Sequence, residues 1–140
     1  MTGIPELDGA AAAAQDWIDD LMRRLQWRDQ RKVYAVLLAG LHALRDSLPR
    51  DEVVYLGAQL PPLLRGLYYE GWRPTGRPSA AKSRDAFLER IHDAVHHEPG
   101  IDPEHAARAV FALLAQRLPP AELEDTKAAT PKLLRALWPS

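Results

Sequence analysis

The sequence predicts an all-α protein, a single compact bundle of about eight helices built from two pseudo-symmetric four-helix repeats. Three observations lead to this prediction. Apolar residues recur with the 3.6-residue period of an amphipathic helix. No segment alternates between polar and apolar residues as a half-buried strand does. Finally, a shift of 70 residues superimposes the first half of the chain on the second, which indicates an ancient duplication.

The 70-residue shift pairs the two halves position by position. The pairs with identical residues are Leu44/Leu114, Leu48/Leu118, Pro49/Pro119, Glu52/Glu122, Ala58/Ala128, Pro61/Pro131, Leu63/Leu133, Leu64/Leu134, Arg65/Arg135 and Leu67/Leu137. Because a piece of about 60 to 70 residues is only marginally stable alone, we expect the two copies to pack face to face about a pseudo-twofold axis. Residues 1–140 then form one domain, with repeat one at about 12–72, a linker at about 73–82 and repeat two at about 83–138.

The first two helices of each copy are predicted from apolar stripes and start signals. The first helices are expected over about 12–25 and 83–96, each with an apolar stripe on one face and charged residues opposite. The second helix of the first copy is expected to begin at Asp29, a good N-cap residue. Its counterpart is expected to begin at Asp102, followed by Pro103, because a proline at the first helical position loses no hydrogen bond.

The third and fourth helices are short and are separated by prolines. A Leu-Pro pair ends each second helix, because proline disfavours helical geometry in the preceding residue. These pairs are Leu48-Pro49 and Leu118-Pro119. Third helices are expected over 50–58 and 120–128. The fourth pair is expected to open at Pro61 and Pro131, with Thr130 as the cap of the second.

Composition excludes several classes of protein. The chain has no cysteine, so it holds neither disulfides nor thiolate zinc sites. Its longest apolar stretch, 33–41, is about half of the roughly 20 residues that a membrane span needs. The apolar run at 10–14 follows acidic residues and does not resemble a signal peptide, so we expect a cytoplasmic protein. A formal net charge of −1 weighs against a dedicated nucleic-acid binder.

The sequence favours a protein that is not an enzyme. Its serines stand in no glycine elbow, and neither a phosphate-binding glycine loop nor a His-Glu-x-x-His motif occurs. No cofactor is predicted. Carboxylates or tyrosines that gather only in the folded chain would leave no such signature, so an enzymatic activity stays open at this point.

The segment from Arg65 to Trp72 is the strongest candidate for a binding surface. The two copies differ most here, because Arg135 repeats Arg65 without the Tyr-Glu-Gly-Trp tail. The candidate partner-binding residues are Gln59, Arg65, Tyr68, Tyr69, Glu70 and Trp72. Aromatic side chains and arginine are typical of interface hot spots, so a protein partner or a second copy of the chain is expected. A purely structural role remains the alternative, with Gly71 ending the helix in a left-handed conformation.

The segment from Trp72 to Arg84, which includes the linker, carries basic residues and no acidic ones. They are Arg73, Arg77, Lys82 and Arg84. Such a cluster attracts anions, so an anionic small ligand is one hypothesis for this segment. The alternative is a solvated linker whose arginines form surface pairs with Asp16, Asp19 and Asp20 of the first helix.

A metal site is the second hypothesis for function. His92 and His96 lie four residues apart on one expected helix, and His105 follows after a turn. Three converging imidazoles would bind a divalent cation. Histidines on a polar helix face explain the same residues, and a small ligand in a cavity between the repeats is a further variant of this hypothesis.

The string LGAQLPPLLRGLYYEGW at 56–72, preceded by HALRDSLPRDE and followed later by LLRALWP, resembles the bacterial family called domain of unknown function 2267. The resemblance spans most of the chain. It implies a small soluble helical protein, in some cases associated with general stress proteins, and it implies no reaction, substrate or cofactor. The function that the sequence favours is therefore a non-enzymatic interaction protein that binds through the segment from Arg65 to Trp72.

Overall fold

A computed structural model describes residues 2–74 and 83–140 of the chain. This part holds seven α-helices, one 3-10 helix and no strand, which confirms the predicted all-α class. In chain order the elements are α1 (Pro5–Leu25), α2 (Gln30–Ser47), α3 (Arg50–Ala58), α4 (Pro62–Tyr69), α5 (Arg84–Ala94), α6 (Pro103–Arg117), α7 (Pro120–Ala129) and the 3-10 helix η1 (Lys132–Leu137).

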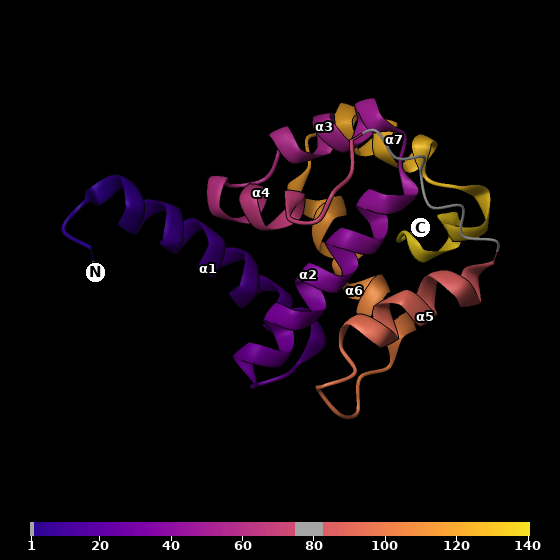
Figure 1. Cartoon of the computed structure of the whole chain (residues 1–140), viewed down its shortest axis with the longest axis horizontal. Coiled ribbons are helices and arrows are strands. Elements are labelled where there is room, and N and C mark those ends of the chain that lie inside the picture. The colour runs from indigo at the N-terminus through magenta and orange to yellow at the C-terminus, as the bar shows by residue number, and fades with distance from the viewer. Residues whose placement is uncertain (1, 75–82) are drawn as a thin grey trace.

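Helix α1 begins earlier than predicted. It starts at Pro5 rather than near residue 12, because proline suits the first helical position and Glu6 and Asp8 lie in the first turn, where the helix dipole favours negative charge. The alanines that follow have the highest helix propensity of any residue. In Figure 1 the indigo N-terminal part of α1 extends away from the other helices.

Helices α2 and α6 begin where the sequence predicts. The Asp29 carboxylate accepts hydrogen bonds from the backbone amides of Arg31 and Lys32. The Asp102 carboxylate accepts a hydrogen bond from the backbone amide of Glu104 in the same way. Helix α6 then begins at Pro103, directly after its cap. Both helices end before a Leu-Pro pair, which confirms the predicted stop signal.

The end of the chain departs from the prediction in two details. The last element is a 3-10 helix rather than an α-helix. Thr130 does not cap it: its hydroxyl donates a hydrogen bond to the Thr126 carbonyl at 2.7 Å and accepts one from the Trp138 indole at 3.1 Å. Thr130 is buried, so its hydroxyl requires partners inside the protein, and both come from neighbouring helical segments. Helix α5, by contrast, has an N-cap side chain, since the Ser83 hydroxyl accepts a hydrogen bond from the backbone amide of Ala86.

The core lies along the contact between α2 and α6, which Figure 1 places at the centre of the molecule. The closest approach is at Gly40, where an added Cβ would lie 2.8–3.0 Å from three side-chain atoms of Val110. Fully buried leucines and aromatic residues surround this crossing, including Leu37, Leu41 and Phe111. Because residue 40 has no side chain, the backbone of α2 packs directly against the Val110 side chain of α6.

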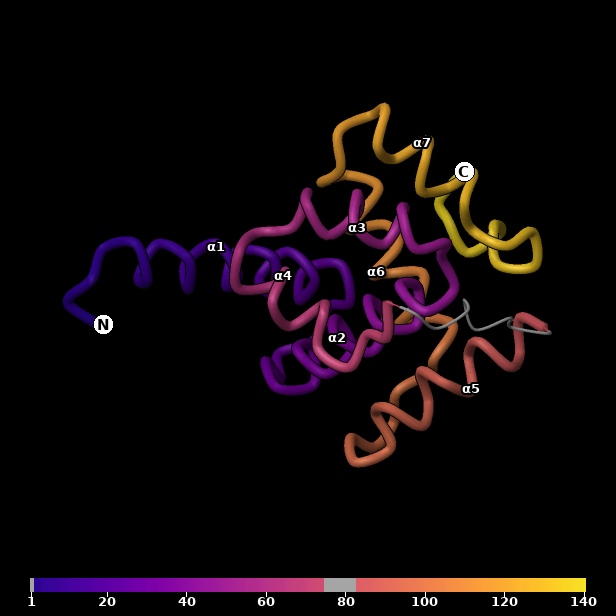
Figure 2. Tube along the Cα trace, turned by 45° about the horizontal axis from the view of Figure 1, so that its top comes forward, coloured from indigo at the N-terminus to yellow at the C-terminus, as the bar shows by residue number. Residues whose placement is uncertain are grey.

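The outer helices pack on this centre in a reciprocal arrangement. Helix α1 contacts α2 and α6, and α5 contacts the same two helices. Helices α3 and α7 lie side by side at one end, as Figures 1 and 2 both show. Ion pairs join the outer helices to the central ones. Arg117 of α6 contacts Asp20 of α1 at 3.0 Å, and Arg90 of α5 contacts Asp46 of α2 at 2.6 Å. Among residues 2–74 and 83–140, no helix is long and apolar enough to span a membrane.

Candidate functional site

Helix α4 presents the segment that the sequence singles out. It follows Pro61 and ends at Tyr69, and the next residues turn sharply back. Gly71 has φ of +78°, a left-handed conformation that glycine adopts without the penalty of a Cβ. The amide of Trp72 donates to the Tyr69 carbonyl at 3.0 Å, so Trp72 folds back onto the end of the helix.

Arg65 has a structural role in this fold. Its Nε donates to the Gly57 carbonyl at 3.0 Å, and its Nη2 donates to the Leu60 carbonyl at 3.0 Å. These oxygens lie at and just after the C-terminal end of α3, where helical partners are missing. Arg135 makes the equivalent contacts with the carbonyls of Thr130 and Ala128, both at 2.9 Å. The guanidinium of Arg65, a candidate partner-binding group from the sequence, therefore donates its hydrogen bonds to the end of α3.

Tyr68 lies in the core rather than on the surface. Its side chain is 0% exposed, and its hydroxyl donates to the Val53 carbonyl at 2.8 Å. Burial, together with the nearby Tyr69, raises the pKa of the Tyr68 hydroxyl far above its ordinary value, so it stays protonated. The prediction that Tyr68 contacts a partner directly does not fit this geometry, because the side chain offers a partner no area.

Tyr69 and Trp72 form a half-buried aromatic pair beside Tyr68. The ring centroids of Tyr69 and Trp72 are 5.5 Å apart. Those of Tyr69 and Tyr68 are 5.0 Å apart, in an edge-on arrangement. Tyr69 covers Gly57 of α3 so closely that a Cβ there would lie 2.7 Å from the phenol carbon Cζ. Of the other predicted contact residues, Gln59 and Glu70 are exposed.

Helix α3 adds large apolar side chains that sequence analysis did not identify. Val54 is 46% exposed and Tyr55 is 58% exposed, and Leu63 at the start of α4 is 47% exposed. Val54 stands one turn before Gly57, on the side of α3 that Tyr69 covers. We call Val54, Tyr55, Leu63, Tyr69 and Trp72 the α3–α4 surface. The signal that could have found it is the 70-residue register, which pairs Val54 and Tyr55 with acidic residues.

A buried arginine holds this surface in place. Arg45 of α2 is 4% exposed, and its Nη1 donates to the carbonyls of Tyr68 and Glu70, both at 2.7 Å. Its Nε donates to the Asp46 carboxylate at 2.8 Å, which also accepts from Arg90 of α5 at 2.6 Å. Burial opposes ionisation of Asp46, but the hydrogen bonds from both arginines outweigh it and lower the pKa of this carboxyl. Position 115, which the 70-residue shift pairs with position 45, is alanine, so the shift does not mark this role of Arg45.

Two of the four basic residues of the predicted anion site lie within the described residues. Arg73 is exposed, and Arg84 pairs with Glu104 at 2.8 Å. Arg77 and Lys82 lie outside the described residues. The acidic residues of the first helix pair with another arginine: Arg117 contacts Asp16 at 2.8 Å and Asp20 at 3.0 Å.

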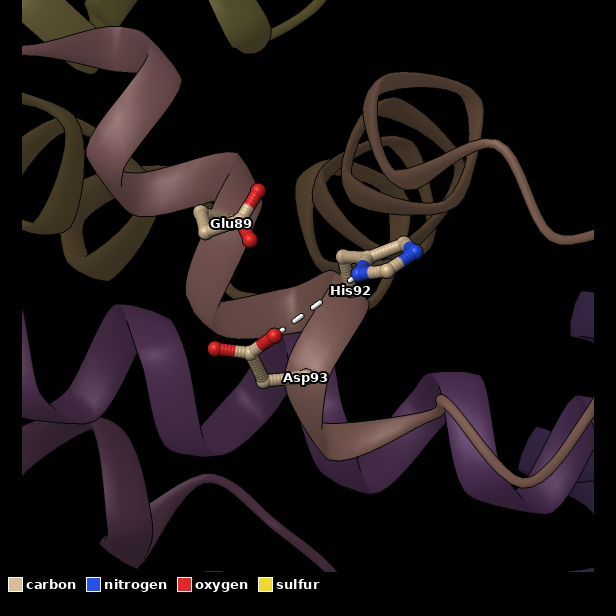
Figure 3. A group of neighbouring side chains, drawn as sticks. All are labelled: Glu89, His92 and Asp93. Atoms are coloured by element: carbon tan, nitrogen blue, oxygen red, sulfur yellow. Dashed lines mark ion pairs between the residues drawn. The ribbon is translucent and has the colours of Figure 1, made fainter.

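The histidines predicted to bind a metal do not converge. The His96 ring nitrogen Nδ1 lies 2.6 Å from the Asp93 carbonyl, whereas the His105 ring lies beside Trp27 with centroids 6.4 Å apart. In the part of the chain that the structure describes, the group that brings His92 together with other possible ligands is Glu89, His92 and Asp93, shown in Figure 3. All three are exposed, and neighbouring positions of one helix explain their proximity. Among the described residues, the predicted His92, His96 and His105 are not grouped together, and His105 lies beside Trp27.

The hypothesis of a ligand cavity between the repeats finds no support in the crossing of α2 and α6, where Val110 leaves no room beside Gly40. A shallow depression lies elsewhere, at the C-terminal end of α1. It is lined by Asp19, Met22, Arg23, Gln26, Trp27 and Arg28. The depression is open to solvent and is not an enclosed ligand site. Beside it, the Lys32 ammonium lies 4.7 Å from the centre of the Trp27 ring.

One comparison with known proteins identifies a relative of this sequence. The profile of the family described as uncharacterized conserved protein (DUF2267) matches residues 14–137. The match runs from Ala14 in α1 to the end of η1 and includes the α3–α4 surface. No curated protein matches the chain.

Proposed function

Because the chain belongs to the DUF2267 family, whose description names no activity, we propose its function from its own surface: it is a non-enzymatic protein-interaction module that binds a partner protein through the α3–α4 surface. Exposed apolar and aromatic side chains on rigid elements are the features that protein partners use. Gln59 and Glu70, both exposed, are the polar residues of the predicted set at its rim.

A comparison inside the chain carries this proposal. In the 70-residue register Val54 corresponds to Glu124 and Tyr55 to Asp125, and both acids are exposed on α7. The same position in the same kind of helix thus carries charge in one copy and apolar area in the other. The fold itself does not require Val54 and Tyr55 at these positions. Exposing them costs solubility, and a partner that covers them supplies the reason for keeping them.

The α3–α4 surface is held in a fixed conformation before binding. Arg65 and Arg45 pin the ends of α3 and α4, and Tyr69 is packed between Gly57 and Trp72. Aromatic side chains immobilised in advance lose little conformational entropy when a partner covers them. This pre-formed arrangement supports a binding surface.

We also propose that the bundle consists of two duplicated four-helix repeats around a pseudo-twofold axis. A residue on such an axis contacts its own counterpart. Gly40 packs against Val110, its partner in the 70-residue register, and the contacts of Glu52 and Glu122 meet at one threonine hydroxyl. The reciprocal packing of α1 on α6 and of α5 on α2 supports the same arrangement.

The proposal is tested by giving α3 the residues that α7 carries. We expect Val54→Glu with Tyr55→Asp to keep the helical circular dichroism signal, because these residues occur at the same exposed positions of α7, and to abolish capture of the partner from lysate of the native host. The matched control is Leu133→Glu, which changes the equally exposed counterpart of Leu63 in the second copy.

Capture of the same partner by the double variant would contradict the proposal. So would equal loss of capture in Leu133→Glu, because binding would then depend on general surface polarity. Leu63→Glu completes the set and is expected to behave as the double variant does, since Leu63 belongs to the α3–α4 surface.

A further inference from the structure

Two carboxyl groups face one buried hydroxyl where α3 meets α7. The Thr126 hydroxyl lies 2.8 Å from Oε1 of Glu52 and 3.3 Å from Oε1 of Glu122. Thr126 is 0% exposed, and both glutamates are half-buried. The two glutamates come from different helices that pack side by side, so this group bridges the contact between α3 and α7.

Counting hydrogen atoms determines what this arrangement requires. A threonine hydroxyl has one hydrogen to donate, and here two carboxyl oxygens lie within its reach. If both glutamates are ionised, the hydroxyl donates its hydrogen to only one of the two carboxylates. The second carboxylate then receives no hydrogen bond from Thr126 and lies close to the negative charge of the first. With one glutamate protonated, its own O–H supplies the missing hydrogen. The geometry is therefore satisfied when the pair carries one proton between its two carboxyl groups.

The charges around the pair favour the same protonation state. Neither glutamate takes part in an ion pair among residues 2–74 and 83–140. The neighbouring titratable groups are Asp125 on α7 and Tyr68 on α4, and Asp125 adds negative charge. Burial, then the hydrogen bond and the charge of Glu52, raise the pKa of Glu122 to about 7.

We propose that Glu52 and Glu122 form a proton-binding site, in which one shared proton holds α3 against α7 and loss of that proton at mildly alkaline pH loosens this contact. The inference goes beyond the proposed partner binding and does not rest on it. The site differs from an ordinary structural hydrogen bond because the contact between the helices depends on a proton that exchanges near neutral pH.

Titration of the side-chain carboxyl carbons by NMR tests the shared proton. We expect one carboxyl of the pair to titrate near pH 7, and Glu52→Gln to bring the titration of Glu122 down by at least about one pH unit, since a like charge disappears and an amide donor replaces it. Glu124→Gln on the same helix is the matched control, because Glu124 is exposed, and it should leave the titration unchanged. Titration of both carboxyls in the ordinary glutamate range would overturn the proposal.

A distance measurement tests the loosening. The chain has no cysteine, so Ala58→Cys with Ala128→Cys places one spin label on α3 and one on α7, both at exposed positions. The distribution of label distances should broaden between pH 6 and pH 8.5 in the otherwise native chain. It should stay narrow at both pH values with Glu122→Gln, which has no proton to lose. A distribution that is the same at both pH values in the native chain would show that the proton does not hold the helices.

Discussion

Replacing Gly40 with alanine perturbs the central helix contact by a single methyl group. The new Cβ would lie 2.8 Å from Val110 Cγ2 and 3.0 Å from Val110 Cβ and Cγ1. Val110 is fully buried in the core. Overpacking of this kind costs about 1–3 kcal/mol. Alanine's higher helix propensity returns up to about 1 kcal/mol. With the full propensity gain returned, we expect Gly40→Ala to lower the free energy of unfolding by up to about 2 kcal/mol.

Urea denaturation followed by far-UV circular dichroism measures this change. The matched control is Gly66→Ala in α4, where an added Cβ has no heavy atom within 4 Å. The control should gain up to about 1 kcal/mol from helix propensity alone. If the Gly40 variant is stabilised as much as the control, α2 and α6 do not pack closely at this position.

A double-mutant cycle assigns the cost to the named contact. Val110→Ala removes Cγ1 and Cγ2, two of the three atoms that the new Cβ meets. Combined with Gly40→Ala, it should destabilise the chain by less than the sum of the two single changes, with a coupling of at least about 0.5 kcal/mol. Strict additivity would place the cost of Gly40→Ala outside the Val110 contact.

Three further outcomes are expected. Tyr68→Phe should lower the unfolding free energy by about 1 kcal/mol in urea denaturation, because it removes one buried hydrogen bond to the Val53 carbonyl; no loss would show that this bond is not formed. Arg45→Met should cost about 3 kcal/mol in the same assay, because two carbonyls and Asp46 lose a buried charged donor; a cost as small as that of a surface substitution would contradict the buried network. The unfolding free energy should fall as pH rises from about 4.5 to about 7, because in that range the folded chain keeps a proton on Glu122 that the unfolded chain has lost; Glu122→Gln should flatten this part of the pH profile, and a native chain without the fall would refute it.

Much of the fold follows from signals that act within a few residues. Asp29 and Asp102 cap their helices as predicted because an N-cap depends only on the next three residues. The bounds of α3 agree with the sequence for the same reason, since a proline precedes it. The start of α1 was missed because the apolar stripe weakens before residue 12, although Pro5 and its acidic neighbours already form a start signal.

The site is less predictable because it depends on which helix covers which side chain. Tyr68 and Tyr69 are adjacent in sequence, yet the rotation of about 100° per helical residue sends one into the core and the other onto Gly57. Arg45 lies on an apolar helix, and nothing in its own segment indicates that the end of α4 would surround it. Periodicity identifies an apolar face, but only the packing of other helices decides whether that face is covered.

Site-specific photo-cross-linking shows whether a partner protein lies against the α3–α4 surface. A photoreactive phenylalanine replaces Tyr55 in one chain and its register counterpart Asp125 in another, and both are irradiated in cells of the native host. We expect a covalent adduct of one defined mass from position 55 and none from position 125. Absence of an adduct at position 55, or adducts of equal yield at both positions, would contradict the proposed binding surface.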